Sequence, residues 1–173
     1  NKAQGNATLK GAVYGVFKMD GTKIAELITD SNGYAKSDYL SSVGKLYIQE
    51  LKASEGYKLD PNKYEIEISE TNLEPSIQVK EEIIEGKIKI SKYDRENNFC
   101  KAQGSATLKG AIYEIFDIRG NLVDTLTIGE DCTALSKNLP YGNYKIKEKY
   151  SSKGYLLDVN IYIANITENK IID

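Results

Sequence analysis

One pattern of residues occurs twice in this chain, and the repeat constrains the fold more than any other feature. Residues 4–14 recur as residues 103–113, at an offset of 99, and residues 56–60 recur as residues 154–158, at an offset of 98. A repeat of this length is a whole small domain rather than one unit of a solenoid. The chain of 173 residues therefore consists of two copies of one domain.

Each copy is a series of short runs rich in β-forming residues and separated by turn residues. Many short strands without helical periodicity are typical of a sandwich or a barrel. We predict an all-β protein with two tandem immunoglobulin-like β-sandwich domains, residues 1–85 and residues 86–173, joined by a very short linker. The strands expected in copy one are residues 12–17, 23–28, 45–51, 64–68 and 77–84.

The two copies are framed differently. Copy two has an expected strand, residues 87–94, ahead of its repeated segment, whereas copy one starts directly at that segment. Copy one ends with the strand at residues 77–84, but copy two stops at Asp173, where that strand is expected to begin. We therefore predict that copy one lacks its first strand and copy two its last. Because a missing strand leaves backbone groups unpaired, strand exchange between neighbouring chains is also expected.

The first strand of copy two carries an unusual inward lysine. Residues 86–94 alternate, so that Ile88, Ile90 and Lys92 share one face. The isoleucines require this face to be the buried one, and a buried lysine is costly unless it is paired or neutralised. Lys92 therefore needs a partner inside the second domain.

A later strand supplies an inward acid. Tyr144, Ile146 and Glu148 share a face, and the residues between and after them are lysines that must face water. Glu50 is in the same register in copy one. Burial is expected to lower the pKa of Lys92, leaving a nucleophilic neutral amine, and to raise the pKa of the glutamate.

Four short motifs occur together in copy two. They read KYD from Lys92, LKGAIY from Leu108, GNYKIKE from Gly142 and GY from Gly154, and copy one holds counterparts of the last three. This combination resembles the Cna B-type, or SpaA-like, prealbumin-fold domain of Gram-positive surface adhesins and pilins. The resemblance covers nearly the whole chain, twice.

The resemblance implies a chemistry. Many members of that family form a spontaneous amide between a lysine on the first strand and an asparagine or aspartate on the last, assisted by a buried glutamate. The matching positions are Lys92 and Glu148, with Glu50 as the equivalent glutamate in copy one. The acceptor of copy one should fall near Glu81 or Glu82, neither of which is Asn or Asp, so we predict no such bond there.

In copy two the acceptor is not identified. The nearby candidates are Asn165, Asn169 and Asp173. The alternative is a buried ion pair between Lys92 and Glu148 without a covalent bond.

The two cysteines belong to copy two alone. Cys100 aligns with Asn1 and Cys132 with Gly33, and this paired difference suggests that the cysteines touch. An extracellular location would permit a disulfide between them, and the alternative is two free thiols. Because the chain has no histidine, we expect no zinc site, and no other metal or cofactor is expected.

The resemblance implies a structural stalk module of a cell-wall-anchored Gram-positive adhesin or pilin-like protein, outside the cell, whose partners are neighbouring repeats. One alternative is a module that binds host matrix glycoprotein or glycan through Tyr34, Tyr39 and Tyr47. A glycosidase using Glu50 or Glu148 would need two carboxylates facing one cleft. These two lie in different copies, so we expect no enzymatic activity. The net charge of −2 gives no basic surface for nucleic acid, and no apolar run is long enough for membrane insertion.

Overall fold

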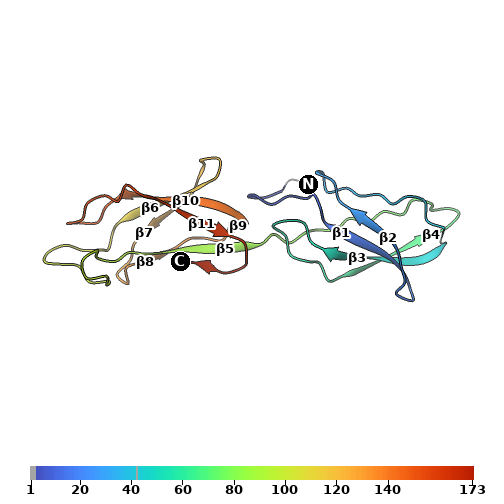
Figure 1. The fold of residues 1–173 in the computed structure, drawn as a ribbon, viewed down its shortest axis with the longest axis horizontal. Coiled ribbons are helices and arrows are strands. Elements are labelled where there is room, and N and C mark those ends of the chain that lie inside the picture. Colours follow the sequence, from blue (N-terminus) through green and yellow to red (C-terminus); the bar gives the residue numbers. More distant parts are fainter. Residues whose placement is uncertain (1–2, 42) are drawn as a thin grey trace. The chain divides into compact units, whose positions relative to one another are not determined.

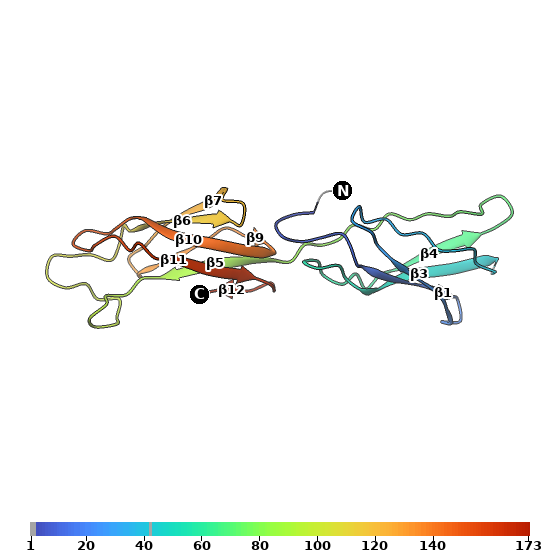
Figure 2. The ribbon, with the colours of Figure 1, turned by 45° about the horizontal axis from the view of Figure 1, so that its top comes forward.

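A computed structural model describes residues 3–41 and 43–173 of the chain. Every regular element of secondary structure in these residues is a β-strand, which confirms the all-β prediction (Figures 1 and 2). The chain forms two compact units, Asn1–Ile83 and Ile84–Asp173, which we call module 1 and module 2. The described residues contain no helix long and apolar enough to cross a membrane.

Module 1 has one antiparallel sheet of four strands in the order β2-β1-β3-β4 (Figure 1). Val16 on β1 and Leu46 on β3 point into its core, as the alternation of these strands requires. The sheet matches the first four strands predicted for copy one to within one residue at each end. Its members are β1 (Val13–Lys18), β2 (Lys23–Ile28), β3 (Gly44–Lys52) and β4 (Lys63–Ile68).

The prediction of a strand at residues 77–84 is wrong. This segment is coil, tied to the module by an isolated bridge between Tyr57 and Ile83 and by a hydrogen bond from Lys58 N to Glu82 O (2.8 Å). A strand needs a neighbour for its backbone groups. None of the described residues of module 1 lies beside this segment as a ladder partner.

Module 2 is a sandwich of two sheets. One sheet has the order β11-β10-β6-β7, and the other has β5 between β12 and β8, with β9 pairing a further part of β5. The strands are β5 (Glu85–Ser91), β6 (Ile112–Asp117), β7 (Leu122–Thr127), β8 (Thr133–Leu135), β9 (Leu139–Pro140), β10 (Gly142–Tyr150), β11 (Ile161–Ile166) and β12 (Ile171–Ile172).

The prediction that copy two lacks its last strand is wrong in part. β12 is a short final strand that runs parallel to β5, with Ile171 opposite Lys87 and Ile172 opposite Ile88. β5 therefore has a neighbour on each side. This central position explains how a strand with two lysines can hold the second sheet together.

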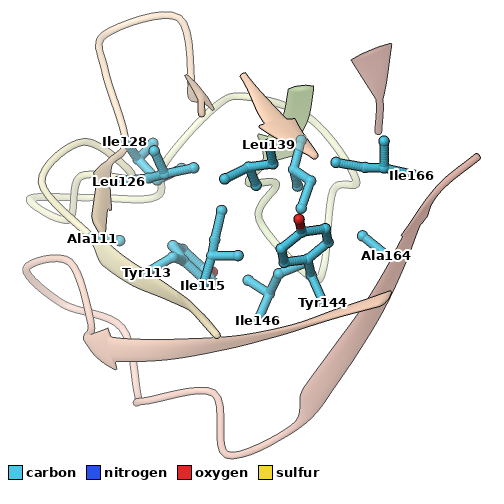
Figure 3. Packing of buried hydrophobic residues seen from close by; sticks show 11 residues of the cluster. Ala111, Tyr113, Ile115, Leu126, Ile128, Leu139, Tyr144, Ile146, Ala164 and Ile166 are labelled. Atoms are coloured by element: carbon cyan, nitrogen blue, oxygen red, sulfur yellow. The ribbon is translucent and has the colours of Figure 1, made fainter. Parts of the chain in front are cut away.

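The core of module 2 lies between its two sheets (Figure 3). Tyr144 and Ile146 of β10 point toward the same interior as Leu139 of β9 and Ile166 of β11. Ile88 of β5 is 2% exposed and belongs to the same cluster. The face of β5 that leads to Lys92 is therefore the face that meets the core.

Candidate functional site

Module 2 holds a buried ion pair between its sheets. Lys92 follows the end of β5, and its backbone N donates to Cys132 O (2.8 Å). Its Nζ lies 2.8 Å from Oε1 of Glu148 on β10, and the two side chains are 11% and 0% exposed. The same Nζ donates to the hydroxyl of Tyr113 on β6 at 3.3 Å. The alternation of two separate strands thus brings a cation and an anion to one point.

The second oxygen of Glu148 is also occupied. Glu148 Oε2 accepts a hydrogen bond from the backbone N of Asp158 at 2.6 Å. Asp158 is itself held by Tyr162, whose hydroxyl donates to it at 2.5 Å, and by the backbone N of Asn160. A carboxylate fixed through both oxygens is held in place against Lys92.

The predicted lowering of the Lys92 pKa is wrong. Burial does act to lower it, but the hydrogen bond and charge of Glu148 together with the Tyr113 hydroxyl outweigh burial, and the pKa lies above its ordinary value. Lys92 is thus an ammonium ion in this arrangement. A neutral amine would have to arise by transfer of a proton to Glu148, which is within hydrogen-bond distance.

None of the three acceptor candidates of copy two reaches Lys92. Asn165 is exposed on β11, and Asn169 Oδ1 accepts from the backbone N of Glu85 (2.8 Å). Asp173 accepts from Lys89 Nζ (2.9 Å) and from a serine hydroxyl of β5 (2.8 Å). The site therefore contains the amine and the assisting acid without an amide acceptor among these candidates.

A second buried acid, Asp94, fastens the chain just beyond the lysine. It accepts hydrogen bonds from the Tyr155 hydroxyl (2.7 Å), from Gln103 Nε2 (3.0 Å) and from the backbone N of Glu96 and Asn97. The Tyr155 hydrogen bond and then the others hold the pKa of Asp94 below its ordinary range, against the effect of burial. Sequence reasoning did not assign this clamp, although the KYD and GY motifs contain its two ends.

The cysteines lie next to this site. Cys100 and Cys132 are joined as a disulfide with an S–S distance of 1.98 Å and a sequence separation of 32. Cys132 also accepts the backbone hydrogen bond from Lys92 described above. The disulfide therefore ties the loop after Asp94 to the residue that accepts the backbone hydrogen bond of Lys92.

Module 1 has the acids of the site, but no hydrogen bond joins them to a lysine among its described residues. Glu50 on β3 is 2% exposed, and its Oε2 accepts from the backbone N of Asp60 at 2.6 Å, as Glu148 does from Asp158. Glu81 Oε1 accepts from the Tyr14 hydroxyl at 2.5 Å. Burial raises the pKa of Glu50; the Asp60 hydrogen bond opposes this and the charge of Glu81 adds to it.

The comparison with protein families decides what kind of domain this is. The model of the SpaA prealbumin-like fold domain matches residues 1–83 and again residues 86–173. The chain belongs to this family. The expected family resemblance is thereby confirmed for both copies.

Solved structures and a surface protein of Gram-positive bacteria are similar to these SpaA-like domains. The Bacillus anthracis TIE protein is 28% identical with a TM-score of 0.74, over 99% of this chain and 31% of that chain. The trypsin-resistant surface T6 protein of Streptococcus pyogenes serotype M6 is 47% identical over 58 residues, 34% of this chain and 11% of that protein. A C-terminal fragment of the pilus adhesin SpaC of Lactobacillus rhamnosus shares the fold (15% identity, TM-score 0.53, 95% and 76% covered). The chain thus spans about a third or less of the first two proteins.

The residues proposed for ligand binding and for glycosidase activity do not form a common site in either SpaA-like domain. Tyr34 and Tyr39 are exposed, whereas Tyr47 is buried and stacks on Phe17 with 5.0 Å between ring centroids. These three tyrosines therefore do not form one exposed binding face. Glu50 and Glu148, the carboxylates of the enzyme alternative, belong to different compact units.

Proposed function

We propose that this chain is a load-bearing part of the stalk of a Gram-positive surface adhesin or pilin-like protein, outside the cell and attached to the cell wall. The observation that carries the proposal is the Lys92–Glu148 pair, buried between the two sheets of module 2 at 2.8 Å. Membership of the SpaA family and the similarity to the TIE and T6 proteins support it. The work of such a segment is mechanical, and its partners are the neighbouring repeats.

We further propose that Lys92 forms an intramolecular amide when a strand with a suitable acceptor continues from β12. Lys92 passes a proton to Glu148, and the neutral amine attacks the side-chain carbonyl carbon of an asparagine or aspartate. The new C–N bond replaces the C–N bond of the asparagine or the C–O bond of the aspartate. The nitrogen of Lys92 loses a second proton as the amide forms. Both protons pass through Glu148 to the leaving group, which departs as an ammonium ion from asparagine or as water from an ionised aspartate.

The register of β12 supports one position for the proposed acceptor. β12 pairs with β5 at an offset of 84 (171 minus 87, and 172 minus 88). A parallel ladder that continued in this register would place position 176 opposite Lys92, on the same face. Asp173, opposite Lys89 in this register, already contacts Lys89.

The test is the intact mass of a chain extended past Asp173 by an alternating strand with asparagine at position 176. We expect a mass lower by one ammonia under denaturing conditions, and the full mass in the Lys92→Met and Glu148→Gln variants. The matched control carries the asparagine at position 175, which faces away from Lys92, and should keep its full mass. A full mass for the position-176 chain, with module 2 folded, would disprove the amide.

A further inference from the structure

The strand β11 forms an open edge of module 2. It stands at the end of the order β11-β10-β6-β7, with β10 on one side and no ladder partner on the other among residues 3–41 and 43–173. At its last residue, Ile166 packs so close to Gly86 of β5 that an added side chain there would touch it at 3.0 Å. Residues 161–163 are exposed. Because β12 pairs with β5 in the other sheet, a chain that continued in this register would run along β5 and leave the edge of β11 open.

The outer face of this edge strand is apolar. Ile161 and Ile163 lie opposite Lys147 and Lys145 of β10, and they are 56% and 61% exposed. Ala164 is buried, so these isoleucines are on the side of the sheet that is turned away from the core. The loop ahead of the strand adds two more exposed apolar side chains, Leu156 and Val159. Apolar side chains gathered at one place on a surface are typical of a site of association.

Module 1 protects the equivalent edge with charge. At the repeat offset of 98, Ile161 and Ile163 correspond to Lys63 and Glu65 of β4. Lys63 also covers the ring of Tyr47, with its Nζ 4.5 Å from the ring centroid. Charged side chains and proline on an edge strand discourage pairing with another chain. Module 2 has lost these guards at five positions: Leu156 replaces Lys58, Val159 replaces Pro61, Ile161 replaces Lys63, Ile163 replaces Glu65, and Asn165 replaces Glu67.

Charge decides which strand fits against this edge. The described part of the chain has four edge strands of six residues, β2, β4, β7 and β11, and only β11 has no charged side chain. β2 carries Lys23 and Glu26, and β7 carries Asp124, whose carboxylate already accepts from the backbone N of Lys137 (3.0 Å). Pairing β11 with any of these strands would take a charge out of water beside an apolar strand, which is costly. A second β11 brings no charge, so the complementary partner is β11 of another copy.

We propose that two copies of this chain associate through β11, as an antiparallel pair of strands around a two-fold axis at Tyr162. This axis places Ile161 of each copy opposite Ile163 of the other, so that four isoleucines pack together on the outer face. The paired residues are then 160–164, which keeps the ladder away from Ile166 and its contact with β5. The contact joins two stalk segments side by side, and it does not depend on the proposed amide.

The charges beside the edge allow this arrangement. Lys145 and Lys147 flank the isoleucines on β10. In the dimer, β10 lies three strand spacings, about 14 Å, from β10 of the second copy. This exceeds the screening length of about 8 Å at physiological salt, so the two sets of lysines repel each other little. A two-fold contact is self-complementary and closes as a dimer, so the open edge does not grow into a fibre.

Sedimentation equilibrium of the full chain of 173 residues tests the association. We expect a reversible monomer–dimer equilibrium between about 1 µM and about 1 mM, the range of affinities of small interfaces. A monomer at every concentration would refute the pairing of two copies and would point to an uncharged strand of a different protein as the occupant.

Variants assign the contact to β11. Ile161→Lys with Ile163→Glu restores the residues of module 1 and should weaken the dimer at least about a hundredfold, because burial of each isoleucine is worth more than a factor of about ten. The matched control is Leu122→Glu on β7, the opposite edge of the same sheet, where Leu122 is 52% exposed. This control should leave the dimer unchanged. Slow hydrogen exchange of β5 and β10 in each variant shows that module 2 is folded. A dimer that survives the β11 change in folded protein would overturn the proposal.

Cysteine cross-linking tests the position of the two-fold axis. Residues directly opposite in an antiparallel pair have Cα atoms about 4.5–5.5 Å apart, which a disulfide can span, whereas diagonal neighbours are about 7–8 Å apart. We expect a cross-linked dimer when chains with Ile161→Cys and chains with Ile163→Cys are mixed and oxidised, and none from either variant alone. Cross-linking of the Ile163→Cys chain with itself, or no cross-link in the mixture, would refute the axis at Tyr162.

Discussion

Removing either partner of the Lys92–Glu148 pair should destabilise module 2 far more than removing an exposed pair. The two side chains are 11% and 0% exposed, and the Nζ–Oε1 distance is 2.8 Å. Removal of one member of a buried pair leaves the other charge without compensation, at a cost of about 3–5 kcal/mol. Because Lys92 keeps some contact with water, we expect about 3 kcal/mol for each of Lys92→Met and Glu148→Gln.

The double variant separates the pair from the rest of the packing. Lys92→Met with Glu148→Gln removes both charges, so its loss of stability should be smaller than the sum of the single losses by about 2 kcal/mol or more. The matched control is the cycle on Lys109 and Glu130, an exposed pair in the same module (55% and 81% exposed). Its coupling should be below about 1 kcal/mol.

The assay must report on module 2 alone, because the chain has two compact units. Hydrogen exchange of the slowest amides of β5 and β10, followed by mass spectrometry in increasing urea, gives the free energy of unfolding of that module. Additive single losses in the Lys92–Glu148 cycle would refute the reasoning. So would a coupling no larger than that of the exposed pair.

Two further predictions concern the surroundings of the lysine. Reduction of the disulfide, or Cys100→Ser, should lower the free energy of unfolding of module 2 by about 3–4 kcal/mol, the loop-entropy estimate for a separation of 32 residues. The stability of module 1 should not change. Urea unfolding with and without reductant measures both. Asp94 has a folded-state pKa below its ordinary 3.8, so its contribution is present above pH 3.8 and is lost as the pH falls through the folded value. Asp94→Asn should therefore lose less stability than the natural chain in an acid titration by circular dichroism, and an unchanged acid profile would contradict the clamp.

The directions of Lys92 and Glu148 were predictable because β5, which leads to Lys92, and β10, which carries Glu148, each alternate strictly. Ile88 fixes the inner face of β5, and the lysines at alternate positions fix the outer face of β10. A side chain on an alternating strand has only two directions, so burial of the apolar set settles the rest. No comparable pattern gives the Tyr113 contact, which depends on how the two sheets pack.

The failures have physical causes too. Residues 77–84 have a strand-like sequence, but a strand forms only against a neighbour, and local propensity carries no information on whether one is present. The prediction of a lowered Lys92 pKa was wrong because it considered the burial of the lysine without the negative charge of Glu148. Both errors come from reading one segment without its partner.

The two copies act as controls for each other on how a neighbouring strand affects the local structure. They share the sheet that carries the glutamate, and β3 and β10 hold Glu50 and Glu148 in the same way, with one oxygen on a backbone N at 2.6 Å. They differ in whether a β5-type strand occupies the opposite sheet among the described residues. Where it does, the neighbouring segments are strands and the acid has its cation. Where it does not, the same segments are coil, and Oε1 of Glu50 has no donor among the described residues. The filling strand, rather than the sequence of its neighbours, therefore determines whether the second sheet of this domain forms.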